Sequence, residues 1–312
     1  MTSALTPGGP ATEAKPRLGF LGTGAMGSRL AARLLDAGYP LTVYNRTHAR
    51  TQPLAQRGAQ IAATPEELAA RSSIILSCLA DDAAVEAVLL GPGGAVAGAR
   101  PGTTFIEMST ILPATSRAVA TATGARGLTA LDAAISGSTP AAAAGTLVLL
   151  VGGEQEVFDR CRPILSALGQ HVYYMGPSGM GTTMKLVVNA MLGVGIQALA
   201  EALALGEKAG LEKGRLLDVL AQTAVISPRQ KLALENVRRE EYPVTFALQL
   251  MHKDFGLILR EAESLQVPMP VTAAAEQLST IELAGGKAGD ITATIRWMED
   301  LAGTPSPEGP AT

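Results

Sequence analysis

The stretch LGFLGTGAMGSRLAARLL, residues Leu18–Leu35, decides the fold class. A short apolar run leads into a G-x-G-x-x-G turn and then into a segment with helical periodicity that ends at Gly38. A second apolar run, LTVYN, follows directly, and this order within about thirty residues is typical of a dinucleotide-binding unit. In such a unit Gly22 makes the tight turn, Gly24 lets the backbone approach a pyrophosphate, and Gly27 packs the helix against the strand.

The residues around this turn predict the kind of cofactor. Ala25 and Met26 lie at the start of the helix, where free N–H groups and the positive dipole end attract an anion. Asn45, Arg46 and Thr47 end the second strand, where an acid would accept hydrogen bonds from the ribose of NAD. An arginine there would instead hold a 2′-phosphate through charge-assisted hydrogen bonds. We therefore expect NADP(H), with NADPH preferred and NAD as the alternative, unless Arg46 is an ordinary solvated surface residue.

Composition excludes several classes of protein. The chain has 312 residues, of which 47% are hydrophobic and 17% charged, with a formal net charge of −3. This allows one or two well-buried domains and argues against nucleic acid or an anionic membrane as partner. Cys78 and Cys161 predict two buried thiols in a reducing, cytoplasmic compartment. The three histidines are scattered, so we expect no metal site. The apolar segment Leu186–Leu205 contains polar residues and predicts an interior helix rather than a membrane span.

Strand and helix signals alternate up to about Pro177 and then stop alternating. The first pattern is typical of a Rossmann-type α/β domain with a parallel sheet covered by helices on both faces. From Thr182 to Leu301 the sequence predicts helix alone, with breaks at glycines and prolines.

We expect no signal peptide at the N-terminus. The predicted units are a disordered tail at 1–15, an NADP-binding Rossmann domain at 16–179, an all-α helical C-terminal domain at 180–302 for substrate binding and dimerisation, and a disordered tail at 303–312. The predicted strands are Leu18–Leu21, Leu41–Tyr44, Ile74–Cys78, Thr104–Glu107, Thr146–Val151 and His171–Tyr174, and the predicted helices of this domain include Gly24–Ala37, Asp82–Leu90 and Pro113–Thr123.

Six separated motifs follow one another between about Arg17 and Leu301. They are GFLGTGAMGSRLA, SCLADDAAVEAVL, EMSTILP, DAAISGSTPAAAAGTL, GMGTTMKLVVNAML and FALQLMHKDFGLIL. In this order they resemble the β-hydroxyacid dehydrogenase family, which includes 3-hydroxyisobutyrate dehydrogenase and the glyoxylate/succinic semialdehyde reductases. The resemblance implies a small carboxylate or aldehyde substrate and a homodimer or homotetramer assembled through the helical domains.

The resemblance implies Lys185 as the catalytic residue, with Asn189 beside it. A lysine can give a proton to the alkoxide formed by hydride transfer, or remove it in reverse, if desolvation lowers its pKa. Because the two residues are four apart, they share one helix face. Taken alone, Lys185 would more often be a surface lysine whose stem covers apolar neighbours.

The resemblance also implies a substrate clamp made by Ser136 and the N–H of Gly137. The sequence departs from the family's pattern here, because Ser138 and Ala141 stand where glycines are usual, which restricts the backbone. Thr110 resembles a residue near substrate and nicotinamide, although a helix cap before Pro113 is the alternative. The other residues that the resemblance places at the site are Ser138, Phe246 and Asp254 on the substrate side and Cys78, Leu79, Ala80, Thr110 and Lys253 on the cofactor side.

These residues predict an NADP(H)-dependent oxidoreductase that interconverts a small β-hydroxyacid and its semialdehyde or oxo acid. An imine reductase is the second hypothesis, but these enzymes usually carry Asp or Tyr at the position of Lys185. A protonated lysine would also repel an iminium substrate. A non-enzymatic module on a dehydrogenase fold is the third hypothesis, and the presence of Lys185 and Asn189 argues against it.

Overall fold

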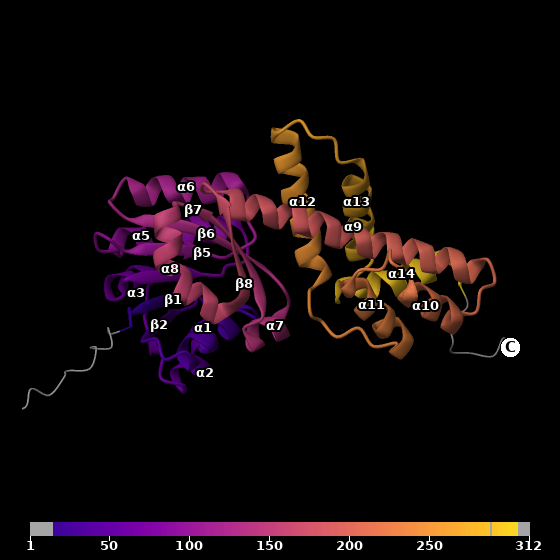
Figure 1. The fold of residues 1–312 in the computed structure, drawn as a ribbon, viewed down its shortest axis with the longest axis horizontal. Coiled ribbons are helices and arrows are strands. Elements are labelled where there is room, and N and C mark those ends of the chain that lie inside the picture. The colour runs from indigo at the N-terminus through magenta and orange to yellow at the C-terminus, as the bar shows by residue number, and fades with distance from the viewer. Residues whose placement is uncertain (1–14, 288, 305–312) are drawn as a thin grey trace, which may run out of the picture.

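The computed structural model describes residues 15–287 and 289–304, which form an α/β part followed by a helical part (Figure 1). The predicted tails lie outside the described residues except for Lys15, Gly303 and Thr304. The last strand ends at Gly176 and the first helix of the helical part begins at Met180.

The α/β part is built on one sheet with the strand order β3-β2-β1-β4-β5-β6-β7-β8. Each pair from β3 to β6 is parallel, as a Rossmann-type fold requires, so the predicted fold class is confirmed. The strands are β1 (Leu18–Leu21), β2 (Leu41–Tyr44), β3 (Gln60–Ile61), β4 (Ile74–Ser77), β5 (Thr104–Glu107), β6 (Thr129–Ser136), β7 (Leu147–Gly153) and β8 (Gly169–Gly176).

Three features of the sheet differ from the sequence-based expectation. The two-residue strand β3 was not predicted, because so short a segment has no local strand pattern. β7 runs antiparallel to β6, and β8 is parallel to β7, so the last two strands reverse the sheet direction. The connection from β6 to β7 is shorter than a parallel crossover needs, which explains the reversal. β6 itself was not predicted, because its sequence TALDAAIS is rich in alanine and contains an acid, both of which are poor strand signals.

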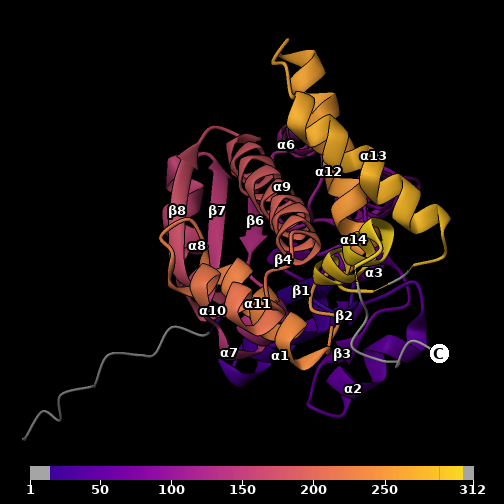
Figure 2. The ribbon, with the colours of Figure 1, turned by 90° about the vertical axis from the view of Figure 1, so that its right-hand side faces the viewer.

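The helices cover both faces of the sheet and form the whole of the helical part (Figures 1 and 2). In the α/β part they are α1 (Gly27–Asp36), α2 (Gln52–Ala55), α3 (Pro65–Arg71), α4 (Asp82–Val85), α5 (Ala95–Gly98), α6 (Pro113–Gly124), α7 (Thr139–Ala144) and α8 (Gln155–Leu168), with short helical turns η1 (His48–Thr51) and η2 (Glu86–Leu90). The helical part contains α9 (Met180–Lys208), α10 (Lys213–Gln222), α11 (Pro228–Arg239), α12 (Leu248–Ser264), α13 (Pro270–Ala284), η3 (Ile291–Ala293) and α14 (Thr294–Ala302).

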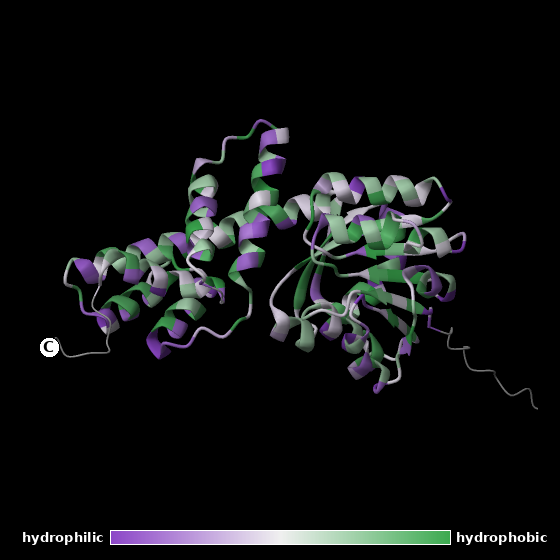
Figure 3. Cartoon of the chain, turned by 180° about the vertical axis from the view of Figure 1, so that it is seen from behind, coloured by the Kyte–Doolittle hydropathy of each residue, from purple (hydrophilic) through white to green (hydrophobic). Residues whose placement is uncertain are grey.

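Burial explains why the short strands form. All residues of β1 and β5 are buried, as expected for strands covered on both faces. Phe20 on β1 belongs to one apolar cluster and Phe105 on β5 to another, while a third cluster fills the helical part. Figure 3 shows the apolar strands at the centre of the α/β part and polar residues on its outer helices.

Helix α9 joins the two parts of the molecule (Figure 1). It is the helix in the described residues that is long and apolar enough to cross a membrane by length and composition, and it packs against β6, β7, α12 and α14. The buried Asp132 of β6 caps its start, accepting hydrogen bonds from the N–H groups of Gly179 at 2.7 Å and Thr182 at 2.8 Å. A Cβ on Gly181 would overlap the backbone of β6 and β7, so the helix starts in direct contact with the sheet.

Candidate active site

The glycine turn has the geometry that a dinucleotide needs. Gly22 has φ +92°, which favours glycine, and a Cβ there would overlap the carbonyl oxygen of Cys78. A Cβ on Gly27 would overlap the carbonyl oxygen of Gly22, so this glycine lets α1 lie against the turn. A Cβ on Gly24 would meet nothing within 4 Å, so the backbone there faces open space. The open side of Gly24 and the start of α1 fit a pyrophosphate, with Ala25 and Met26 in the same turn.

Of the three residues after β2, Asn45 forms hydrogen bonds within the protein, whereas Arg46 and Thr47 are exposed. Asn45 uses its side chain within the protein: Oδ1 accepts the N–H of Thr23 at 3.0 Å, and Nδ2 donates to the carbonyl oxygen of Thr47 at 3.0 Å. It therefore ties the end of β2 to the glycine turn. Arg46 and Thr47 are exposed beside it, which leaves the guanidinium free to meet a ligand.

Two more turns meet this edge of the sheet. Cys78, Leu79 and Ala80 follow β4, and the N–H of Cys78 donates to the carbonyl oxygen of Leu21 at 2.9 Å. Thr110 follows β5, and its carbonyl oxygen accepts a hydrogen bond from Nζ of Lys253 at 2.7 Å. The carboxyl ends of the parallel strands are where ligands bind in this fold. The helix-cap alternative for Thr110 is wrong, because Leu112 is the residue that directly precedes α6. The carboxylate of Asp82 accepts the N–H of Leu112 at 2.9 Å.

Lys185 and Asn189 lie on the same buried face of α9. Lys185 is 9% exposed and Asn189 is 1% exposed. Asn189 donates from Nδ2 to Oδ2 of Asp254 on α12 at 2.6 Å. Its Oδ1 is buried and has no hydrogen-bond partner among the described residues, so an acceptor is available next to Lys185.

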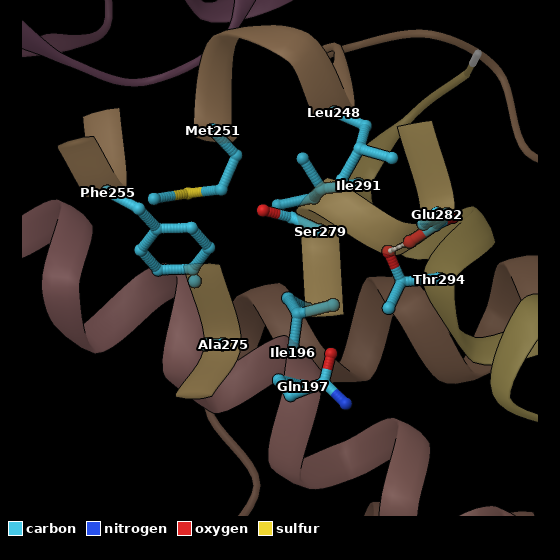
Figure 4. Close-up of a pocket in the computed structure, with 11 residues that line it drawn as sticks. Ile196, Gln197, Leu248, Met251, Phe255, Ala275, Ser279, Glu282, Ile291 and Thr294 are labelled. Carbon is cyan, nitrogen blue, oxygen red and sulfur yellow. Dashed lines mark hydrogen bonds between the residues drawn. The ribbon is translucent and has the colours of Figure 1, made fainter. Parts of the chain in front are cut away.

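A close helix crossing brings α12 to this face of α9. Gly193 lies one turn beyond Asn189, and a Cβ there would overlap the ring of Phe255 and crowd Met251. Figure 4 shows Phe255 and Met251 side by side on α12 at this crossing. A glycine is therefore needed where the two helices meet, and the crossing sets the distance between Asn189 and Asp254.

The same region contains a small hollow in the helical part (Figure 4). Its wall is mostly apolar and includes Met251 and Phe255, the residues that flank Lys253 and Asp254. On its polar side Thr294 donates to Oε2 of Glu282 at 2.8 Å. The hollow adjoins the helix crossing, and none of the predicted catalytic residues lines it.

Burial and nearby charges set the protonation of Lys185. The pKa of Lys185 is lowered to about 8, chiefly because burial removes water from the ammonium group. The negative charge of Asp254 opposes this change, and the positive charge of Lys253 adds to it. Lys253 is itself paired with Asp254, with Nζ 2.9 Å from Oδ1. Burial raises the pKa of Asp254, and its neighbours Lys253, Lys185 and Asn189 act against that rise. A lysine with a pKa near neutrality can both donate and accept a proton at physiological pH.

The predicted substrate clamp lies at the end of β6. Ser136 is the last residue of this strand, and Gly137 follows with φ +139°, where a Cβ would press on Leu147. Ser138 precedes α7 in an extended conformation with φ −104°, which tolerates a side chain without strain. The serine that replaces a usual glycine is therefore compatible with the loop, and it adds a hydroxyl beside Ser136.

Phe246 is held in place by a residue that the sequence analysis did not identify. Oδ2 of Asp290 accepts the N–H groups of Thr245 and Phe246, each at 2.8 Å, and Oδ1 pairs with Arg229 at 3.1 Å. These bonds fix the segment that leads into α12 and so into Lys253. Asp290, Asp132 and Glu107 are all buried in the structure. The one sequence signal that could have marked them is an acid directly beside an apolar residue, and this signal does not reveal their partners.

Comparison with known proteins agrees with this geometry. Residues 17–176 match the family described as the NAD-binding domain of 6-phosphogluconate dehydrogenase. Residues 179–298 match the family described as NAD-binding of NADP-dependent 3-hydroxyisobutyrate dehydrogenase.

Individual relatives are similar along most of their length. The 2-(hydroxymethyl)glutarate dehydrogenase of Eubacterium barkeri is 33% identical over 293 residues, which cover 92% of this chain and 96% of that protein. The 3-hydroxyisobutyrate dehydrogenase of Pseudomonas aeruginosa is 35% identical over 271 residues, which cover 85% and 91%. A crystal structure of 3-hydroxyisobutyrate dehydrogenase from Salmonella typhimurium superposes with a TM-score of 0.81 at 29% identity, covering 91% of this chain and 100% of that chain. The chain therefore belongs to the β-hydroxyacid dehydrogenase family, a class of NAD(P)-binding oxidoreductases that act on CH–OH groups.

Substitutions at Gly24 and Gly27 should distinguish an effect on cofactor binding from an effect on folding. We expect Gly24→Ala to leave stability within about 0.5 kcal/mol, because its Cβ meets no protein atom, but to weaken NADPH binding about tenfold or more by obstructing the backbone approach. Gly27→Ala should cost about 1–3 kcal/mol of folding free energy, because its Cβ overlaps the carbonyl oxygen of Gly22. Chemical denaturation and NADPH fluorescence titration measure the two effects. Unchanged NADPH affinity in Gly24→Ala would contradict the assignment of Gly24.

Proposed function

We propose that this protein interconverts a small β-hydroxyacid and its semialdehyde or oxo acid, with NADP(H) as the redox cofactor. The observation that carries the proposal is the buried Lys185, whose lowered pKa suits proton transfer and which lies beside an Asn189 held by Asp254. The glycine turn and the start of α1 fit the dinucleotide. When bound, the nicotinamide supplies or receives the hydride.

The protein residues position the substrate and move the proton. Ser136 and the N–H of Gly137 bind the substrate carboxylate, which orients the carbonyl carbon. In reduction, the protonated Nζ of Lys185 donates its proton to the carbonyl oxygen as the alcohol forms. In oxidation, neutral Nζ removes the proton from the hydroxyl group. The free Oδ1 of Asn189 accepts a hydrogen bond from the Lys185 ammonium or from the substrate hydroxyl, and Asp254 fixes the amide in this orientation.

NADP(H) is the proposed cofactor because Arg46 is exposed at the end of β2, next to the glycine turn. Asn45 occupies the position where an NAD-binding protein carries an acid, and its side chain is already used by Thr23 and Thr47. The three residues that follow β2, Asn45, Arg46 and Thr47, therefore present a cation and no carboxylate, which favours a 2′-phosphate.

Imine reduction is the competing reaction, and a substrate screen separates the two. With NADPH absorbance as the readout, we expect turnover of one or more of glyoxylate, succinic semialdehyde and tartronate semialdehyde. A cyclic imine should give no turnover, because the positive charge of Lys185 repels an iminium group. With NADP+, 3-hydroxyisobutyrate tests the oxidation. Reduction of the imine alone would overturn the proposed reaction.

The pH dependence of activity tests the role of Lys185. Reduction needs protonated Nζ, so kcat/KM for reduction should fall as the pH rises through the Lys185 pKa of about 8, whereas kcat/KM for oxidation should rise through the same pH. Lys185→Ala should lose about 10²–10⁴-fold in rate while NADPH affinity is nearly kept.

The conservative variant separates proton transfer from simple charge stabilisation. Lys185→Arg should also be inactive, because arginine keeps its charge but does not release a proton near neutral pH. Lys231→Ala, at an exposed position on α11, is the control and should keep full activity. Near-normal turnover by Lys185→Arg would show that a positive charge suffices and that Lys185 is not the proton donor.

Charge reversal at Arg46 tests the cofactor proposal. Arg46→Asp should change the preference for NADPH over NADH by about 3 kcal/mol or more, because it removes a charge-assisted contact and adds repulsion. Fluorescence titration with both cofactors measures the change. Equal affinity of the unmodified protein for NADPH and NADH would rule out Arg46 as a 2′-phosphate ligand.

We also propose a homodimer or homotetramer assembled through the helical part. Val187 and Met191 on α9 are 53% and 76% exposed, and Leu205 on the same helix is 72% exposed. Such apolar exposure along one helix is typical of a protein interface.

Multi-angle light scattering at micromolar concentration tests the assembly. It should give a mass at least twice the 32.0 kDa of one chain. Met191→Glu should shift the protein toward monomer, because it would bury a charge in the interface. A stable monomer of the unmodified protein would contradict the proposed assembly.

A further inference from the structure

Glu107 is a buried acid that the proposed reaction does not use. It is the last residue of β5, at the ligand-binding edge of the sheet, and it is 3% exposed. Burying a carboxyl group is costly unless hydrogen bonds or a cation stabilise it. Among residues 15–287 and 289–304, no lysine, arginine or histidine forms an ion pair with Glu107. Among the described residues, hydrogen bonds are therefore what stabilises this buried carboxyl group.

These hydrogen bonds join the turns that follow two neighbouring strands. Oε1 of Glu107 accepts the N–H of Ser109 at 2.6 Å, and Oε2 accepts the hydroxyl of Ser77, the last residue of β4. The hydroxyl of Ser109 in turn accepts the N–H of Leu79 at 2.7 Å and also contacts Glu107. One carboxylate thus holds the turn after β5 directly and the turn after β4 through Ser109.

The turn after β4 supports the glycine turn. The N–H of Cys78 donates to the carbonyl oxygen of Leu21, and the tight turn at Gly22 packs on the carbonyl oxygen of Cys78. Displacement of Leu79 and Cys78 would therefore move the backbone on which Gly22 rests. The chain of contacts runs from Glu107 through Ser109 and Leu79 to the part of the glycine turn that faces the dinucleotide.

The titratable groups next to Glu107 are Asp132 and Cys78, and neither carries a positive charge that would stabilise the Glu107 carboxylate. On β6, Asp132 lies opposite Glu107 in register, and its carboxylate is engaged by the start of α9. On the side of β4, burial and the charge of Glu107 raise the pKa of Cys78 to about 12, so this thiol stays neutral. Burial raises the pKa of Asp132 as well, and the hydrogen bonds from Gly179 and Thr182 act against that rise.

We propose that Glu107 is a positioning residue of the cofactor site, and that its ionised carboxylate holds the turns after β4 and β5 in the arrangement that binds the dinucleotide. The inference rests on the nicotinamide cofactor of the proposed function. An ionised carboxylate accepts the bonds from Ser77 and Ser109 together. A protonated carboxyl group carries its own donor and loses acceptor capacity toward the same partners, which loosens both turns.

The charge of Glu107 makes cofactor affinity depend on pH. Burial raises the pKa of Glu107 to about 7, and the hydrogen bonds from Ser109 and Ser77 limit the rise. Because the cofactor binds the ionised form better, affinity is greatest above the pKa of about 7 and falls as the pH decreases through it. This dependence concerns the part of the dinucleotide common to NADP+ and NAD+, so both should respond equally.

Isothermal titration of NADP+ into the full-length protein tests the proposal. Between about pH 8 and about pH 6 the unmodified protein should lose about threefold to tenfold in affinity relative to Glu107→Gln, which is isosteric and uncharged throughout. The ratio of the two affinities removes the ligand's own titration, which both proteins share. Glu66→Gln, an exposed acid on α3, is the matched control and should follow the unmodified protein.

A second variant keeps the test decisive if Glu107→Gln does not fold. Ser109→Ala removes the acceptor for Leu79 and should weaken NADP+ and NAD+ by the same factor, unlike a change at Arg46. Parallel pH profiles of the unmodified protein and Glu107→Gln would overturn the proposal, as would unchanged affinities in Ser109→Ala. Absence of NADP+ binding at every pH would instead contradict the proposed function itself.

Discussion

The close crossing of α12 over α9 at Gly193 is the constraint on which the candidate active site depends. It brings Asp254 to 2.6 Å from the amide of Asn189 and places the charges of Lys253 and Asp254 near Lys185. Burial between the two helices removes water from Lys185, which lowers its pKa more than any neighbouring charge does. The chemistry of this lysine therefore follows from helix packing as well as from its identity.

Two tethers connect this crossing to the cofactor side. Asp132 of β6 caps the start of α9, so the helix that carries Lys185 is fixed to the sheet. Lys253 of α12 donates to the carbonyl oxygen of Thr110, which follows β5. Lys185, the proposed proton donor, and the predicted nicotinamide side of the site are thus linked by polar contacts between the α/β and helical parts.

Much of the fold could be predicted from local patterns, because buried parallel strands are short apolar runs and the glycine turn has few alternatives. The spacing of Lys185 and Asn189 likewise predicted one shared helix face. The reversed β7 and the strand β6 were missed, since neither the direction of a strand nor the burial of alanines is a local signal. The roles of Glu107, Asp132 and Asp290 were missed for a related reason: most of their partners belong to other elements, which only the folded chain brings together.

The central claim is that desolvation keeps the pKa of Lys185 close to neutrality. The most direct measurement is an NMR titration of the side-chain Nζ groups in lysine-labelled protein, with Lys185→Arg used to assign the Lys185 signal. We predict that this signal titrates with a pKa of about 8. Titration of Lys185 near the unperturbed value of 10.5 would contradict the account, because the residue would then be neither desolvated nor suited to exchange a proton at physiological pH.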